Sequence, residues 1–91
     1  MLSARRPDHD GEVVHVCDFD GRYFVLLSAR ALAPGQPLAL QLELDGERTL
    51  QLKSLGSKRQ PDGSFQVKAR ASTLSREVRE ALLSRFRKDA L

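Results

Sequence analysis

Tryptophan is absent from this chain of 91 residues, and its aromatic residues are four Phe and one Tyr. A hydrophobic core must therefore consist mainly of Leu, Val and Ala. No apolar run approaches the roughly 18 residues that a membrane-spanning helix requires, so we expect no insertion into a membrane. A chain of this length is typical of one domain, and it can bury a core without disulfide bonds.

Cysteine and histidine are also scarce. Cys17 is the only cysteine, which excludes a disulfide within the chain, and with no apolar targeting segment this predicts a reducing, cytoplasmic location. His9 and His15 do not pair with Cys17 at the spacing of metal ligands, so we expect no metal site. Because the sequence contains no catalytic triad, glycine-rich phosphate loop or nucleophile elbow, we expect no enzyme.

Apolar and polar residues alternate with a period of two through much of the chain, which is the pattern of half-buried β-strands. Strands are expected over residues 12–18, 22–28, 37–44, 48–55 and 64–71, separated by turn signals. The period then changes to 3.6, which predicts a helix over about residues 74–90, with Ser72, Thr73 and Ser75 as candidate N-caps. Residues 12–71 and this helix predict a mainly β domain, 12–91. Its architecture is a small antiparallel β-barrel or curled sheet of five to six strands with one C-terminal α-helix.

Some side chains in these strands can be assigned to a face. In the first expected strand, we place Val13, Cys17 and Phe19 toward the core. In the leucine-rich hairpin, the expected pairs join Leu42 and Leu44 to Leu50 and Leu52. A slip of one residue in that pairing would expose every Leu to water. We expect the apolar stripe of the helix to cover the sheet, the mouth of the barrel, or another protein.

Residues 1–11 are polar and are interrupted by Pro7 and Gly11, which predicts a flexible N-terminal arm. Arg5 and Arg6 lie in this arm. Two adjacent guanidinium groups can clamp a phosphate, because each can donate two parallel hydrogen bonds to its oxygens. A solvated arm without a ligand is the alternative interpretation.

The corner between the first two expected strands gathers acidic, basic, glycine and aromatic residues. Asp18 and Asp20 could recognise the edge of a base or bind a cation, or they could serve only to turn the chain together with Gly21. Arg22 follows as a further candidate ligand residue. Tyr23 is either a strand aromatic or an exposed contact for a partner.

The formal net charge is +3, from 15 Lys and Arg against 12 Asp and Glu. This mild excess permits contact with nucleotides, nucleic acid or an acidic protein surface without requiring any of them. Five cations cluster on the last two expected strands, namely Lys53, Lys58, Arg59, Lys68 and Arg70. They form a candidate basic patch, or a solvated strand face. Aromatic residues are not interleaved with them, so the pattern does not favour single-strand binding.

From residue 12 onward, this layout resembles the PilZ domain, the bacterial receptor module for cyclic di-GMP. The segment from Val16 to Val25 lies where that family has a strand ending in Asp-x-Ser-x-x-Gly. Gly35 matches the glycine that commonly precedes the next Leu-rich strand. The final strand, ending near Ala71, and the Leu-rich helix after it also match.

The signature residues of the family are matched only in part. Asp18 fits the acidic position, whereas Asp20 and Tyr23 stand where the family has Ser and Gly. The arm of the family carries Arg-x-x-x-Arg. In this chain, Arg5 is followed four residues later by His9, and Arg6 by Asp10.

The resemblance implies a non-enzymatic bacterial signalling or adaptor module that contacts another protein, of the motility, pilus or exopolysaccharide machinery. Cyclic di-GMP would be its regulatory ligand, bound weakly or no longer bound. The implied ligand residues are Arg5, Arg6, Asp18, Asp20 and Arg22, with Tyr23 as the partner contact. Two alternatives remain open, a basic β-module that binds nucleic acid and a homo-oligomeric structural protein.

Overall fold

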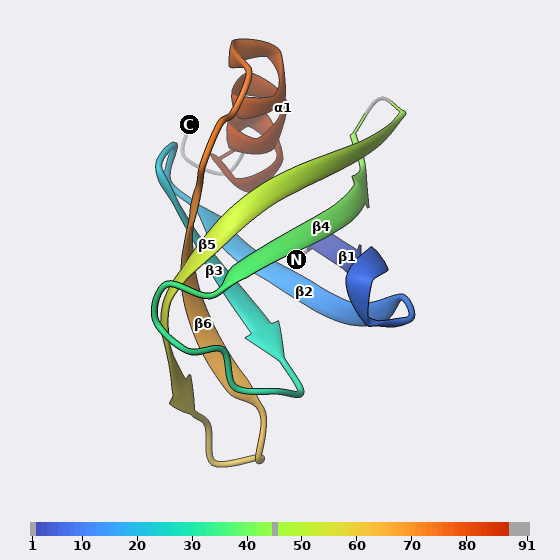
Figure 1. Ribbon diagram of the computed structural model, residues 1–91. Helices are drawn as coiled ribbons and strands as arrows, with labels where there is room; N and C mark the ends of the chain where they lie inside the picture. Colours follow the sequence, from blue (N-terminus) through green and yellow to red (C-terminus); the bar gives the residue numbers. More distant parts are fainter. Residues whose placement is uncertain (1, 45, 88–91) are drawn as a thin grey trace.

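The computed structural model describes residues 2–44 and 46–87 as a closed antiparallel β-barrel with one helix at its end (Figure 1). The strands are β1 (Leu2–Arg6), β2 (Glu12–Phe19), β3 (Tyr23–Ser28), β4 (Pro37–Glu43), β5 (Glu47–Arg59) and β6 (Phe65–Ala71). A short 3-10 helix η1 (Pro7–His9) joins β1 to β2, and α1 (Arg76–Arg87) follows β6. The order around the barrel is β1-β2-β3-β6-β5-β4. The expected small antiparallel barrel with one C-terminal helix is therefore confirmed.

The N-terminal segment corrects the expected flexible arm. Residues 2–6 form β1, which pairs along its whole length with β2 and meets β4 at Arg5 and Gln41. Leu2, Ala4 and Arg6 alternate into the interior. The strand escaped recognition because its third inward residue is an arginine, which hides the period of two that normally marks a strand.

Strand β2 corrects the expected facing of two residues. Its buried residues are Val14, Val16 and Phe19, whereas Val13 is 48% exposed and Cys17 is half-buried. The pairing with β3 shifts between Val16 and Asp18, so Cys17 is the extra residue of a β-bulge. The alternation reverses at that point, which puts Phe19 inside as expected but leaves Val13 and Cys17 outside.

The leucine-rich hairpin keeps the predicted inner face and changes the predicted register. Leu40 pairs with Leu50 and Leu38 with Leu52, and the ladder ends at the pair of Glu43 with Glu47. The expected pairing of Leu42 and Leu44 with Leu50 and Leu52 is therefore wrong by four residues, because Leu50 lies opposite Leu40 and not Leu44. A shift by an even number of residues leaves every Leu inside, because side chains in a strand alternate with a period of two.

Strand β5 is longer than the sequence pattern predicts, since it continues through the expected polar edge to Arg59. A register shift against β6 between Ser54 and Gly56 marks a second bulge. Gly56 has a φ of 130°, a conformation that strongly favours glycine. The bulge redirects the strand, so Lys58 lies beside Gln66 of β6.

Helix α1 closes one end of the barrel, beside the turn between β2 and β3 (Figure 1). Ser75 is its N-cap, because its Oγ accepts a hydrogen bond from the Val78 N–H at 3.2 Å. Val78 and Leu82 are buried in the barrel core, and Leu74 and Phe86 pack against it. The expected stripe is thus covered by the chain's own barrel, which removes the observation behind the homo-oligomeric alternative. Residues 88–90 of the predicted helix lie outside the described residues.

The core contains leucines, valines and two phenylalanines, as the lack of tryptophan predicts. Phe19 and Phe24 are both buried in it, with ring centroids 4.4 Å apart and ring planes tilted by 31°. In the ranges that the structure describes, the one helix lacks the length and apolar character needed to cross a membrane.

Candidate functional site

The two carboxylates of the predicted corner are used to shape the backbone. Asp20 accepts hydrogen bonds through Oδ1 from the N–H groups of Arg22 at 2.9 Å and Tyr23 at 2.8 Å. These bonds, the Tyr23 one foremost, hold the pKa of Asp20 below its ordinary value. Asp18 accepts a bond of 2.9 Å from the N–H of Phe19. The geometry favours the turn interpretation of both residues.

The structure does not bring Arg5 and Arg6 to this corner. They pair with Val13 and Glu12 at the beginning of β2, whereas Asp18 lies near its end. Five residues of strand separate Val13 from Asp18, a distance of roughly 17 Å. The predicted ligand residues therefore divide into two groups at opposite ends of β2.

Arg6 is also inaccessible, with 1% of its side chain exposed. Its guanidinium lies 4.0 Å from Glu12 Oε1 and 3.9 Å from Asp8 Oδ1, at the outer limit of an ion pair. Glu12 in turn accepts a 2.7 Å hydrogen bond from Arg30 Nε. Within the described chain, Arg6 Nε and Nη2 have no hydrogen-bond partner. A buried position of this kind does not fit the expected phosphate clamp.

Arg22 lies in a different setting, a pocket of about 500 Å³ below the helix. Arg70 at the end of β6 and Arg79 in the second turn of α1 also line it. We call the site formed by Arg22, Arg70 and Arg79 the arginine pocket. Its other lining residues are Gly21, Ala71, Ser72 and Leu74, so no carboxylate belongs to its wall.

Contacts between elements far apart in the sequence bring together the backbone segments that carry the three arginines. Tyr23, next to Arg22, pairs with Arg70 across β3 and β6. A Cβ added at Gly21 would lie 3.8 Å from Leu83 Cδ2 of the helix, which shows how closely the corner approaches α1. All three arginines are exposed, and none of them forms an ion pair within residues 2–44 and 46–87. The pocket is therefore an uncompensated cluster of positive charge.

Sequence reasoning identified only part of this pocket. Arg22 was a predicted ligand residue, and Arg70 belonged to the candidate basic patch. Arg79 was not singled out, because a lone arginine on the polar side of a helix has no distinguishing pattern. Its spacing after the Ser75 N-cap places it one turn into the helix, which is the only local signal for its position.

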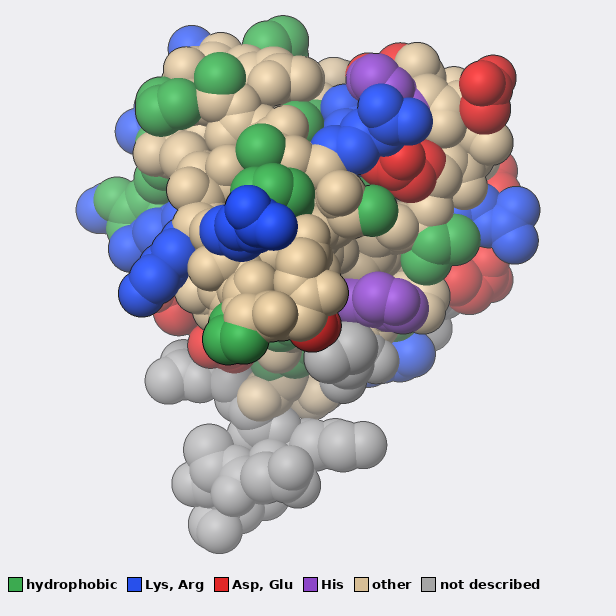
Figure 2. All heavy atoms as spheres, turned by 90° about the horizontal axis from the view of Figure 1, so that it is seen from below, with side chains coloured by type: hydrophobic (Ala, Val, Ile, Leu, Met, Phe, Trp, Pro, Cys, Tyr) green, Lys and Arg blue, Asp and Glu red, His purple; other side chains and the backbone are tan. Residues whose placement is uncertain are grey.

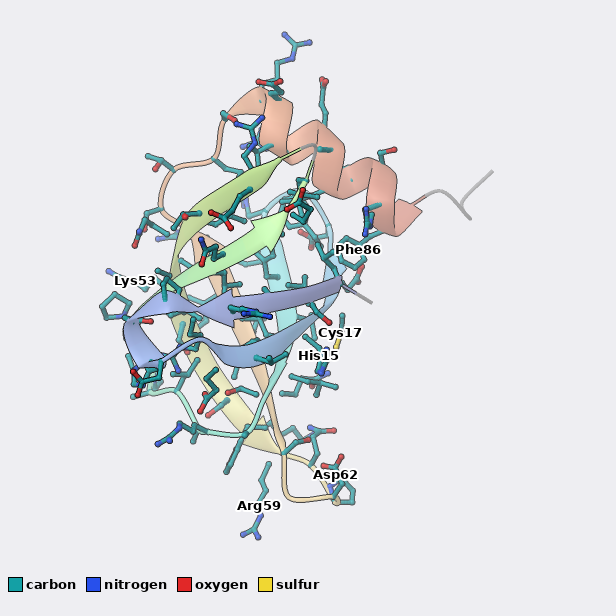
Figure 3. All side chains as sticks on the ribbon, turned by 90° about the vertical axis from the view of Figure 1, so that its right-hand side faces the viewer. His15, Cys17, Lys53, Arg59, Asp62 and Phe86 are labelled. Atoms are coloured by element: carbon teal, nitrogen blue, oxygen red, sulfur yellow. The ribbon has the colours of Figure 1, made fainter. Side chains whose placement is uncertain are left out.

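Tyr23 lies on the outer face of β3, next to the pocket. Its ring is half-buried, and Lys68 Nζ lies 4.7 Å from the ring centroid, a cation–π contact. Lys53 of β5 pairs with Arg70 and projects from the barrel surface (Figure 3). Viewed from below, several Lys and Arg side chains gather at the left margin, and others lie at the top and the right among Asp and Glu side chains (Figure 2). The predicted role of Tyr23 as a partner contact stays a prediction.

Cys17 is half-buried at the bulge, and burial raises the pKa of its thiol. Its Sγ lies 3.9 Å from the carbonyl oxygen of His15, and both residues lie on the β2 side of the barrel (Figure 3). A thiol with a raised pKa stays protonated near neutral pH and is a weak nucleophile. Across the part of the chain that is described, no three His, Cys, Asp or Glu side chains group as metal ligands would.

Comparison with protein-family models found no match, and neither curated proteins nor solved structures returned one. The resemblance to the PilZ domain therefore rests on the residues and layout of this chain alone.

Proposed function

We propose that this protein is a non-enzymatic, cytoplasmic binding module of the PilZ type that recognises a phosphate-bearing ligand in the arginine pocket. The observation that carries the proposal is the convergence of Arg22, Arg70 and Arg79 on one hollow without a carboxylate in its wall. Three cations from three separate elements repel one another unless an anion lies between them.

The chemistry of guanidinium groups supports a phosphate in particular. Each guanidinium is planar and donates parallel hydrogen bonds that match two oxygens of a phosphate. Ser72 lines the same pocket and adds a hydroxyl donor. The volume of about 500 Å³ lies within the usual size of small-molecule sites, so the pocket admits a nucleotide as readily as an inorganic anion.

Cyclic di-GMP is the first ligand to test, because the resemblance to PilZ implies it. The proposed site keeps Arg22 from the implied ligand residues and replaces Arg5 and Arg6 by Arg70 and Arg79. Asp20 places a carboxylate at the edge of the site, within electrostatic reach of Lys68. This charge opposes an anionic dinucleotide, so we expect weak binding. As an adaptor, the protein would contact a bacterial partner protein differently with and without the bound ligand.

The test is isothermal titration calorimetry with cyclic di-GMP, its linear dinucleotide, and inorganic pyrophosphate at moderate salt. We expect saturable binding, and Arg22→Ala, Arg70→Ala and Arg79→Ala should each reduce affinity about tenfold, as the loss of a charged hydrogen bond does. Arg5→Ala removes an equally exposed cation at the other end of β2 and should leave the affinity unchanged.

Two results would refute the proposal. One is the absence of saturable binding for all three phosphate compounds at millimolar concentration. The other is binding that survives replacement of all three pocket arginines. Binding of pyrophosphate without cyclic di-GMP would retain the phosphate site and reject the dinucleotide.

A further inference from the structure

The outer wall formed by β3, β6 and β5 presents a second feature, distinct from the arginine pocket except for Arg70. The strand register arranges its outward residues in three cross-strand rows. The rows are Tyr23–Arg70–Lys53, Val25–Lys68–Gly56 and Leu27–Gln66–Lys58. We call these nine residues the basic wall. It contains four cations and no carboxylate.

The basic wall is divided lengthwise into two chemical tracks. Tyr23, Val25 and Leu27 on β3 are half-buried and form an aromatic and aliphatic track. Arg70 and Lys68 on β6 are exposed and form a cationic track beside it. The tracks are about 5 Å apart, and successive cations on β6 are roughly 7 Å apart, as the spacing of strands and residues in a sheet dictates.

The cations of the basic wall have no anionic partner among the residues that the structure describes. The ion pairs among the described residues involve Arg6, Arg30 and Arg76, which lie outside the basic wall. Asp20 lies within electrostatic reach of Lys68, and its carboxylate already accepts hydrogen bonds from backbone N–H groups of the corner. Lys68 Nζ lies 4.7 Å from the centroid of the Tyr23 ring, and a phosphate is a stronger partner for an ammonium group than a ring is.

The wall is also hollowed beside the cationic track. A groove of about 320 Å³ is lined by Val25, Gly56, Ser57, Lys58, Gln66 and Lys68. Gly56 contributes no side chain at its centre, and its φ of 130° follows from the bulge in β5. Arg70 borders the arginine pocket, two residues beyond Lys68 on the same strand. The cationic surface therefore extends from the groove to the helix.

We infer that the basic wall binds single-stranded nucleic acid, with phosphates on the cationic track and bases against the track of β3. A single strand offers both a row of phosphates and unpaired base faces, which stack on aromatic and apolar side chains. A duplex keeps its base faces inside, so it can use only the cations. An acidic protein segment offers carboxylates for the cations but no regular row of base faces for the track of β3.

The sequence indicated a basic patch but did not favour single-strand binding, because Tyr23 is not interleaved with the cations along the chain. Tyr23 reaches Arg70 and Lys68 only through the pairing of β3 with β6. The inference does not depend on a small ligand in the arginine pocket.

The first test measures fluorescence anisotropy of labelled twelve-nucleotide oligo-dT and oligo-U with the complete chain. If four phosphates are contacted, affinity should fall roughly 50-fold between 50 and 200 mM salt, a log–log slope of about −3. Lys58→Ala with Lys68→Ala should lower affinity at least tenfold and reduce the slope by about 1.4. Comparison of the two oligonucleotides distinguishes DNA from RNA as the preferred strand.

The matched control is Arg5→Ala with Arg85→Ala, which removes the same charge from exposed positions outside the wall. It should change affinity less than twofold. Tyr23→Ala should reduce affinity for oligonucleotide about tenfold, whereas Tyr23→Phe should retain it because the ring still stacks. Circular dichroism of each variant confirms the barrel before binding is measured.

Three outcomes overturn the inference. They are equal loss in the control and wall variants, equal or tighter binding of a duplex of the same sequence, and equal binding of poly-glutamate. If Lys58→Ala with Lys68→Ala abolishes oligonucleotide binding while cyclic di-GMP never binds, the inference stands and the proposed dinucleotide function fails. If cyclic di-GMP binds and oligonucleotides do not, the reverse holds.

Discussion

Arg6 and the arginines of the arginine pocket carry the same side chain in opposite surroundings. Arg6 projects into one end of the barrel, is 1% exposed, and lies within 4.0 Å of Glu12 and Asp8. Arg22, Arg70 and Arg79 are exposed at the other end of β2, where the pocket wall contains no carboxylate. In the first setting a buried charge lies near two carboxylates without a close hydrogen bond to either, and in the second the charges face solvent.

The contrast predicts which arginines contribute to stability and which are available for the proposed binding. A buried charge has lost its hydration and depends on nearby opposite charge. An exposed cation keeps its hydration, so removing it has little effect on folding. Proximity to Pro7 and Asp8 in the sequence made Arg6 look like part of a solvated arm, but its place on the inner face of β1 assigns it to the first class.

The largest expected effect tests the buried side of this comparison. Glu12→Gln removes the carboxylate that lies between Arg6 and Arg30, and it leaves Arg6 buried with only the distant Asp8. We expect a loss of about 3 kcal/mol in the free energy of unfolding, measured by urea denaturation.

A compensating variant makes this prediction specific. Arg6→Met removes the buried charge, and because Glu12 keeps its bond to Arg30, the single variant should lose less than about 1 kcal/mol. The double variant should recover most of the stability lost in Glu12→Gln. If Glu12→Gln lowers the free energy of unfolding by less than about 1 kcal/mol, Arg6 does not depend on that carboxylate. The contrast between Arg6 and the pocket arginines would then not hold.

An intermediate effect tests the exposed side. Arg22→Ala, Arg70→Ala and Arg79→Ala should each change the free energy of unfolding by less than about 0.5 kcal/mol. A phosphate ligand at ten times its Kd should stabilise the wild-type chain by about 1.4 kcal/mol. Thermal unfolding with and without pyrophosphate measures this difference. Equal stabilisation of the three variants would show that the ligand binds elsewhere.

The smallest effect concerns the corner that borders the arginine pocket. Hydrogen bonds from Tyr23 and Arg22 lower the pKa of Asp20 below its ordinary value of 3.8. In the acid range the unfolded chain therefore binds more protons at this residue, so stability rises with pH there. The contribution of Asp20 is present above the ordinary pKa and is lost as pH falls through the lowered one.

Two measurements test the lowered pKa of Asp20 and its effect on stability. Carbon NMR titration of Asp20 should give a pKa under 3.8, and Asp20→Asn should make acid unfolding less steep below that pH. Asn retains a side-chain oxygen for the two N–H groups, so the corner should persist at neutral pH. An ordinary pKa in the folded protein would mean that the turn does not depend on the carboxylate.

Regular strands and the helix stripe could be predicted from the sequence, because alternation reports directly which side of an element is buried. Leu38, Leu40 and Leu52 are inside as their spacing requires. Prediction failed at Cys17 because a bulge inserts a residue without any change in composition. It failed at β1 because Arg6 is polar but faces inward, so the segment has the composition of a polar arm.

The candidate site could be predicted only as far as local signals extend. The corner from Asp18 to Arg22 was recognisable as a turn crowded with charge, and the carboxylate of Asp20 does form it. The partners of Arg22 come from β6 and α1, and no local pattern connects them to the corner. The assignment of Arg5 and Arg6 to the same ligand failed because the extended length of β2 separates them from it.

By itself, the order of apolar and polar residues determined leucine-rich antiparallel strands, in a barrel or curled sheet, with a terminal helix, because burial of one face of each element follows from its spacing alone. Tertiary structure decided which charges are neighbours, since the pairing of β3 with β6 places Tyr23 beside Arg70 and Lys68. It also decided which arginine is buried and which are free to bind. A closed barrel has one interior and two ends. Whether a residue lies in the interior or at one of the ends depends on strands that are far away in the sequence.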